Sequence, residues 1–82
     1  MPEMIRLNGR VEDGLMPAEK VVHVEDADGD IEEIPVSTFS LSEGGLMASE
    51  IGRLGDRVLV ELPRESASGR WRIWVKASAV GV

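Results

Sequence analysis

The sequence predicts a mainly β protein, a small five-stranded antiparallel barrel or sandwich with one short helical turn. Several short segments alternate between apolar and polar side chains, which is typical of half-buried strands. Glycine, proline and aspartate cluster between these segments, as they do in turns. The chain of 82 residues is long enough for one domain, residues 1–82, and too short for two.

The first strand is expected over Met4–Val11. From Ile5 onward, apolar residues and Gly9 occupy the odd positions, while polar residues occupy the even ones. A glycine inside a strand favours a bulge or bend, the device by which small barrels turn corners. The sequence therefore predicts that this strand bends at Gly9.

A hairpin is expected next, formed by Lys20–Asp26 and Ile31–Val36. The acidic stretch Asp26–Asp30 contains an Asp-Gly pair, which tolerates the backbone angles of a hairpin turn. Pro35 lacks the N–H that a ladder hydrogen bond requires, so its strand is expected at or near a sheet edge.

Residues 37–56 give the weakest pattern. Phe39 and Leu41 would share one face of an extended segment, which Gly44-Gly45 then ends. The stretch Leu46–Arg53 is expected to form the short helical turn. Three apolar residues spaced four and three apart would share one helical face; they are Met47, Ile51 and Leu54.

The last two strands are expected over Arg57–Leu62 and Arg70–Ala77. The polar loop Pro63–Gly69 separates them, so a hairpin is the default connection. One lead strand, two hairpins and a helical connector resemble the layout of SH3-like and OB-like barrels. This resemblance concerns layout only and implies no motif or activity.

Composition restricts the functions that the chain can have. The absence of cysteine excludes disulfides and thiolate metal sites, and it favours a reducing, cytoplasmic location. No apolar run is long enough for a signal peptide or a membrane span. The three aromatic residues are few, so the core should consist mainly of Val, Ile, Leu and Met.

Charge is distributed unevenly along the chain. The net charge is −6, which disfavours indiscriminate binding to nucleic acid or anionic membrane. Residues 1–50 hold three basic against twelve acidic residues, a balance of −9, whereas residues 51–82 hold six against three, a balance of +3. We expect the two halves to pack side by side with complementary charges.

The outward side of the last strand is the most suggestive surface. Alternation places Trp71, Ile73, Val75 and Ala77 on the inward side, and Arg70, Arg72, Trp74 and Lys76 on the other. A tryptophan framed by cations can stack on a nucleobase or anchor a protein contact. Leu59, on the outward side of the neighbouring strand, would extend the apolar part of this surface. The alternative is that Trp74 lies under a loop or the helical turn, with the basic residues paired to the acidic first half of the chain.

No catalytic or cofactor-binding arrangement is recognisable. His23 is the only histidine, no serine lies in a nucleophile-elbow pattern, and no glycine-rich phosphate loop is present. The acidic turn Asp26–Asp30 offers oxygen ligands, but its glycine and its twelfth position, Ser37, do not match a calcium-binding loop. We expect a solvated turn, no metal, no cofactor and no enzyme activity; a divalent-ion site at Asp26, Asp28 and Asp30 is the weaker alternative.

The sequence leaves two functions open. The first is a binding module that acts by protein–protein contact, with self-association as one form of it. The second is a nucleic-acid-binding barrel that uses the basic and aromatic strand face, an alternative that the net charge disfavours.

Overall fold

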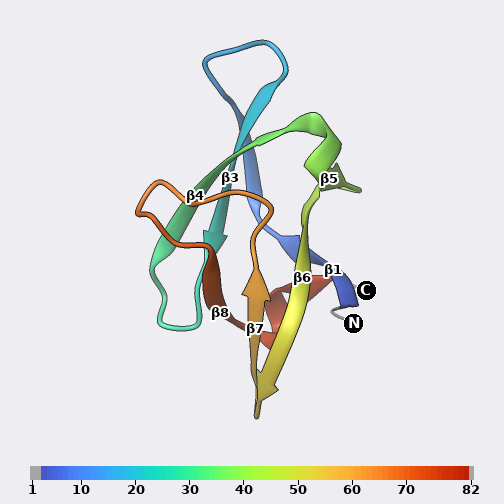
Figure 1. Cartoon of the computed structure of the whole chain (residues 1–82), viewed down its shortest axis with the longest axis vertical. Coiled ribbons are helices and arrows are strands. Elements are labelled where there is room, and N and C mark those ends of the chain that lie inside the picture. The colour runs from blue at the N-terminus through green and yellow to red at the C-terminus, as the bar shows by residue number, and fades with distance from the viewer. Residues whose placement is uncertain (1–2, 82) are drawn as a thin grey trace.

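The computed structural model describes residues 3–81, and these form two antiparallel sheets (Figure 1). One contains β1 (Glu3–Asn8), β5 (Leu41–Ser42), β6 (Gly45–Leu54), β7 (Arg57–Glu61), β8 (Arg72–Lys76) and β9 (Val80–Gly81). The other contains β2 (Arg10–Asp13), β3 (Glu19–Glu25) and β4 (Ile31–Ser37). The strand order is β8-β7-β6-β1-β9 in the larger sheet, with β5 also on β6, and β2-β3-β4 in the smaller. The mainly β prediction is confirmed, although the described chain forms nine strand segments instead of five.

Gly9 is the point at which the chain leaves one sheet for the other. The predicted first strand is divided there into β1, which pairs with β6, and β2, which pairs with β3. A Cβ atom at Gly9 would lie 2.8 Å from the carbonyl oxygen of His23 and 2.9 Å from Cγ1 of Val22. Only glycine lets the two strands approach this closely, so the bend predicted at Gly9 has a steric cause.

The core between the sheets is aliphatic. Among the described residues, its buried side chains are Leu7, Val22, Val24, Ile34, Val36, Leu46, Ala48, Val58, Val60, Leu62, Ile73 and Val75. No methionine among residues 3–81 belongs to this core, contrary to the composition-based prediction. All three aromatic residues lie outside it and are exposed to solvent; they are Phe39, Trp71 and Trp74.

The β3–β4 hairpin forms as predicted, with Pro35 on an edge strand. Its acidic turn is not simply solvated, however. Asp26 is buried, and its Oδ1 accepts hydrogen bonds from the backbone N–H groups of Asp28 and Asp30, both at 2.9 Å. In a tight turn these N–H groups have no backbone acceptor, and the carboxylate takes that place. Asp26 therefore fixes the shape of the turn.

The helical turn predicted over Leu46–Arg53 is wrong, because these residues belong to β6. β6 pairs with β1 along Gly45–Glu50 and with β7 along Ser49–Leu54. Between them, β1, β5 and β7 pair with the whole length of β6, and this tertiary effect outweighs a short helical pattern that two glycines already weaken. The helical turns lie elsewhere, at η1 (Thr38–Ser40) and η2 (Ala77–Ala79). Phe39 is therefore not part of an extended segment with Leu41.

The β7–β8 hairpin is confirmed, but its second strand begins later than predicted. β8 starts at Arg72, which leaves Arg70 and Trp71 in the preceding loop. Trp71, predicted to face inward, is 53% exposed, and its indole Nε1 donates a hydrogen bond of 3.1 Å to Glu65. The Trp71 carbonyl still accepts a hydrogen bond of 2.8 Å from the Leu62 N–H, but its indole bonds to Glu65 and stays outside the core.

The loop between β7 and β8 is fastened to the smaller sheet by a buried polar cluster. The Glu32 carboxylate is buried and accepts hydrogen bonds from Ser66 Oγ at 2.8 Å and Ser68 Oγ at 2.6 Å. Arg70 lies 3.9 Å from Glu32 and 4.0 Å from Asp26. These contacts join the acidic first half to the basic second half, so the predicted charge complementarity is present.

Two backbone hydrogen bonds complete the junction between the sheets. Ala27 N–H donates to the carbonyl of Trp74 on β8, and Ala67 N–H donates to the carbonyl of Glu33 on β4, both at 2.8 Å. The turn of one hairpin and the loop of the other therefore each cover a strand at a sheet edge.

The β2–β3 hairpin projects beyond the larger sheet at one end of the molecule (Figure 1). At its neck, Lys20 Nζ donates a hydrogen bond to Asp13. This hydrogen bond, and secondly the lysine charge, hold the pKa of the Asp13 carboxyl below its usual range.

We expect the Asp13 carboxyl to titrate below the ordinary range of an aspartate, and its pKa to rise back toward that range in the Lys20→Met variant. NMR titration of side-chain carboxyl carbons measures both values. Because the folded pKa is depressed, the stabilising contribution is complete above the unfolded pKa and is lost as pH falls through the folded one. An unchanged titration in Lys20→Met would contradict the assignment of the shift to this pair.

No helix among residues 3–81 combines the length and the apolar character that crossing a bilayer requires.

Candidate binding face on strands β6 to β8

The predicted surface residues on β7 and β8 face each other in cross-strand pairs. Leu59 lies opposite Trp74, Arg57 opposite Lys76, and Glu61 opposite Arg72. In β8 the alternation is regular: Ile73 and Val75 are buried, and the residues between and beside them are exposed. Directly opposed side chains on one face are in contact range, so Leu59 and Trp74 form an apolar pair.

Strand β6 extends this apolar area with residues that the sequence analysis did not assign to it. Gly52 lies opposite Leu59, and Leu54 lies opposite Arg57. Cross-strand partners share a face of the sheet, so Leu54 and Gly52 lie on the same side as Leu59 and Trp74. We call these four residues the outer face: Gly52, Leu54, Leu59 and Trp74.

The outer face is open to solvent. Leu54 is exposed, Leu59 is half-buried, and Trp74 is 38% exposed. A Cβ atom at Gly52 would lie 3.6 Å from Cβ of Leu59, so the missing side chain leaves one flank of Leu59 uncovered. The result is an apolar surface with a low point at the glycine.

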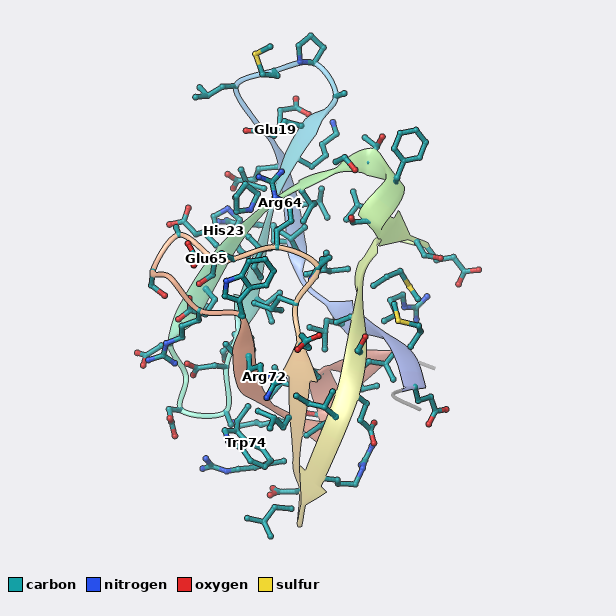
Figure 2. All side chains as sticks on the ribbon, in the orientation of Figure 1. Glu19, His23, Arg64, Glu65, Arg72 and Trp74 are labelled. Carbon is teal, nitrogen blue, oxygen red and sulfur yellow. The ribbon has the colours of Figure 1, made fainter. Side chains whose placement is uncertain are left out.

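The backbone beneath Trp74 is held in place. The Trp74 carbonyl accepts the hydrogen bond from Ala27, which ties the outer edge of β8 to the acidic turn. Figure 2 shows Trp74 and Arg72 along the same strand in the lower half of the view. The tryptophan is thus presented from a fixed strand and not from a loop.

The charged border of the outer face differs from the predicted row of cations. Arg70 is not in this row, because it lies in the loop beside Asp26 and Glu32. Arg72 Nε is 3.1 Å from a Glu61 carboxylate oxygen, and an Arg57 guanidinium nitrogen is 3.4 Å from Asp28. The border is therefore mixed in sign, with the cations Arg57, Arg72 and Lys76 beside two carboxylates.

Leu54 and Gly52 were missed because Leu46–Arg53 was interpreted as helical. If this segment is taken as a strand, Gly52 and Leu54 are two positions apart and therefore lie on one face. The bulge between Glu50 and Gly52 shifts the register, which the sequence does not reveal.

The other polar groups of residues 3–81 form no metal site and no pairing of histidine with a nucleophile. In the part of the chain that the structure describes, no three His, Cys, Asp or Glu residues are placed to hold a metal ion. His23 Nε2 lies 3.3 Å from a Glu12 carboxylate oxygen and makes no hydrogen bond. Among the described residues, no serine hydroxyl is hydrogen-bonded to this histidine. Asp26 and Glu32 are engaged by the turn and the serine cluster.

The fold and the face define a class of protein: a small antiparallel β domain with an aliphatic core and an exposed aromatic–aliphatic surface. Comparisons with family models, with curated proteins and with solved structures find no match to this chain.

Proposed function

We propose that the chain is a non-enzymatic binding module that contacts another protein through the outer face. The observation that carries this proposal is the exposed apolar group of Leu54, Leu59 and Trp74, which lies on a sheet whose other side supplies the core. None of these three side chains belongs to the buried core. Tryptophan is among the residues that most often dominate the energy of a protein interface.

The spacing of charges supports the same function. A protein interface commonly has an apolar centre and a polar border of mixed sign. Arg72 with Glu61, and Arg57 with Asp28, provide such a border around Trp74 and Leu59. These exposed ion pairs contribute little to folding, so they are available to orient a partner.

The alternative is binding of single-stranded nucleic acid, and it rests on Trp74 between Arg72 and Lys76 on β8. Stacking on the indole with phosphate contacts to the cations would be the mode. Two observations weaken it: Arg70 is engaged with two buried carboxylates, and Glu61 partly neutralises Arg72. The net charge of −6 also opposes the approach of a polyanion.

The proposal extends to the architecture. We infer a partly closed barrel as the scaffold, supported by the chain crossing at Gly9 and by the hydrogen bond from Ala27 to Trp74 that joins the sheets.

The test compares Trp74→Ala with Trp71→Ala, a matched loss of one exposed tryptophan away from the face. Affinity capture from a soluble cell extract should retain a partner with wild type and with Trp71→Ala, and lose it with Trp74→Ala. Loss of a hot-spot tryptophan should weaken the contact roughly tenfold or more. Circular dichroism would verify that both variants are folded.

Equal capture by the two variants would overturn the proposal. In parallel, a fluorescent single-stranded oligonucleotide is titrated at low and high salt. Binding that falls steeply with salt, with a reduced slope in Arg72→Ala, would favour the nucleic-acid alternative instead.

A further inference from the structure

Strand β2 has an open edge, unlike β4 at the other side of the smaller sheet. It is the outer strand of that sheet, and its only strand partner is β3. The edges of β4 and β8 are covered by the hydrogen bonds that Ala67 and Ala27 donate. No backbone hydrogen bond from the rest of residues 3–81 reaches the outer side of β2.

The hydrogen-bond pattern shows which residues of β2 face this edge. In an antiparallel pair, opposed residues alternate between those that bond to each other and those whose N–H and C=O groups point away. Gly14 N–H donates to the carbonyl of Glu19 at 2.9 Å, so Gly14 belongs to the first kind. The preceding residue, Asp13, then belongs to the second, as does Val11 two positions earlier. The backbone groups of Val11 and Asp13 therefore point to the open edge.

The β3–β4 ladder confirms this alternation from the other side of β3. Asp26 N–H donates to the carbonyl of Asp30 at 2.8 Å, so even-numbered residues of β3 bond to β4 and odd-numbered ones to β2. The odd-numbered residues of β3 lie opposite even-numbered residues of β2. Among residues 3–81, the N–H and C=O groups of Val11 and Asp13 have no hydrogen-bond partner. The edge thus offers two donors and two acceptors.

The charged side chains of β2 do little to protect this edge. Charges on an edge strand commonly repel an incoming strand. Here, however, Lys20 donates a hydrogen bond to Asp13, and Arg10 lies 3.1 Å from Glu12. The charges along the edge are therefore balanced within the chain, and the free backbone groups are its unsatisfied feature.

We propose that β2 pairs with the β2 strand of a second copy of this chain, antiparallel and about a two-fold axis. The open groups require an extended backbone, and a second β2 is already held extended by its own β3. A flexible peptide would instead lose conformational entropy when it is ordered on the edge. This contact uses a surface separate from the outer face and does not depend on the function proposed for that face.

The register follows from the free groups. With Val11 opposite Asp13 of the other copy, the two symmetric pairs each exchange two bonds, which gives four backbone hydrogen bonds. Val11 opposite Val11 would give only two. The first register also opposes Glu12 to Glu12 of the other copy, and each carboxylate has its own Arg10 at 3.1 Å to offset part of the repulsion.

The assembly closes as a dimer. Pairing occupies the β2 edge of both copies, so a third copy finds no free edge of this kind. The contact is short, and the net charge of −6 adds a repulsion that salt screens. We therefore expect weak association that rises with protein concentration and is stronger at moderate than at low salt.

Sedimentation velocity of the pure chain at rising concentration tests the pairing, with two variants at one position. Val11→Pro removes a donor at the open edge, and the ladder with β3 does not use that N–H. Val11→Ala is the matched control, because it shortens the side chain and keeps the N–H. Wild type and Val11→Ala should approach twice the monomer mass and stop there. Val11→Pro should dimerise roughly tenfold more weakly, or less still.

Hydrogen exchange of the wild type gives a second measurement that no variant can disturb. The amides of Val11 and Asp13 should exchange quickly in dilute protein and more slowly at high concentration. The amide of Glu12 faces β3, so it should be protected at both concentrations.

Wild type that stays monomeric at every concentration and salt would overturn the inference, and would leave the capture test of Trp74 unaffected. Mass that grows beyond a dimer contradicts it as well, as does equal dimerisation by a folded Val11→Pro. Dimer formation with no change in exchange at Val11 and Asp13 would exclude the β2 edge. Dimerisation that Trp74→Ala abolishes and Val11→Pro retains would place the contact on the outer face instead.

Discussion

Replacing Gly9 with alanine is expected to lower the free energy of unfolding by about 2–3 kcal/mol, the cost of overpacking a tight site. The added Cβ would lie 2.8 Å from the His23 carbonyl oxygen and 2.9 Å from Val22 Cγ1. The carbonyl is backbone in a central strand, so it cannot move without disturbing the pairing of β3 with β2 and β4. Valine at the same position should cost more, because it adds two further methyl groups to the clash.

Gly52→Ala is the matched control, since it adds the same atom to another glycine in a strand. There the new Cβ would lie 3.6 Å from the nearest side-chain atom, an ordinary contact. We expect a change of at most about 0.5 kcal/mol. Urea denaturation followed by circular dichroism measures the free energy of unfolding of both variants. The comparison holds when the m value, its dependence on urea concentration, is the same in both. Similar losses for the two alanines would show that Gly9 is not sterically required.

Asp26→Ala is expected to destabilise the fold by about 2–4 kcal/mol. The change removes the acceptor for the N–H groups of Asp28 and Asp30 and leaves Arg70 with one buried carboxylate fewer. Hydrogen bonds to a charged acceptor contribute about 1.5–3 kcal/mol each, and partial hydration of the freed donors limits the total. The turn also carries Ala27, whose N–H bonds to Trp74, so disorder in the turn would release the edge of β8.

The Asp26→Asn variant keeps a hydrogen-bond acceptor at position 26 and removes its negative charge. The asparagine oxygen can accept the same two N–H bonds, so we expect a loss of about 1 kcal/mol or less. Asp28→Ala removes an exposed carboxylate of the same turn and should be close to neutral. Thermal unfolding of the three variants tests the assignment. A loss for Asp28→Ala as large as that for Asp26→Ala would show that Asp26 has no special part in the turn.

The alternation of apolar and polar residues predicted those strands in which one face is buried and the other is exposed to solvent. In β8 the buried residues Ile73 and Val75 follow the period of two, because the sheet covers only one side of the strand. Pro35 was placed at an edge because it lacks a donor, and the edge position is confirmed. The bend at Gly9 was predicted from the frequency of glycine at bulges and corners, and the structure adds its cause, the close approach of the His23 carbonyl.

The predictions were wrong where contacts between residues distant in sequence determine the local structure. β6 is held by strands on both sides, which a window of ten residues cannot reveal. Arg70 was predicted on the strand, but it lies near two buried carboxylates, Asp26 and Glu32, that are distant in sequence. Asp26 was predicted to be solvated with its turn, since a local view does not show that the turn lies against β8 and Arg70.

The candidate surface was predicted in part. Leu59, Arg72, Trp74 and Lys76 lie on the strands that alternation indicated. Gly52 and Leu54 were absent from the prediction, because their strand was unrecognised and its bulge sets the register. Side chains on one strand can be predicted from spacing, whereas the neighbours across strands require the topology.

The two hydrogen bonds from Ala27 and Ala67 have a consequence for solubility. A bare edge strand can recruit an extended segment from another molecule and begin amyloid-like stacking. Here the carbonyls of Trp74 and Glu33 are already occupied by the chain itself. An extended segment that adds to β4 or β8 would first have to break these bonds, so we expect these two edges to resist strand addition.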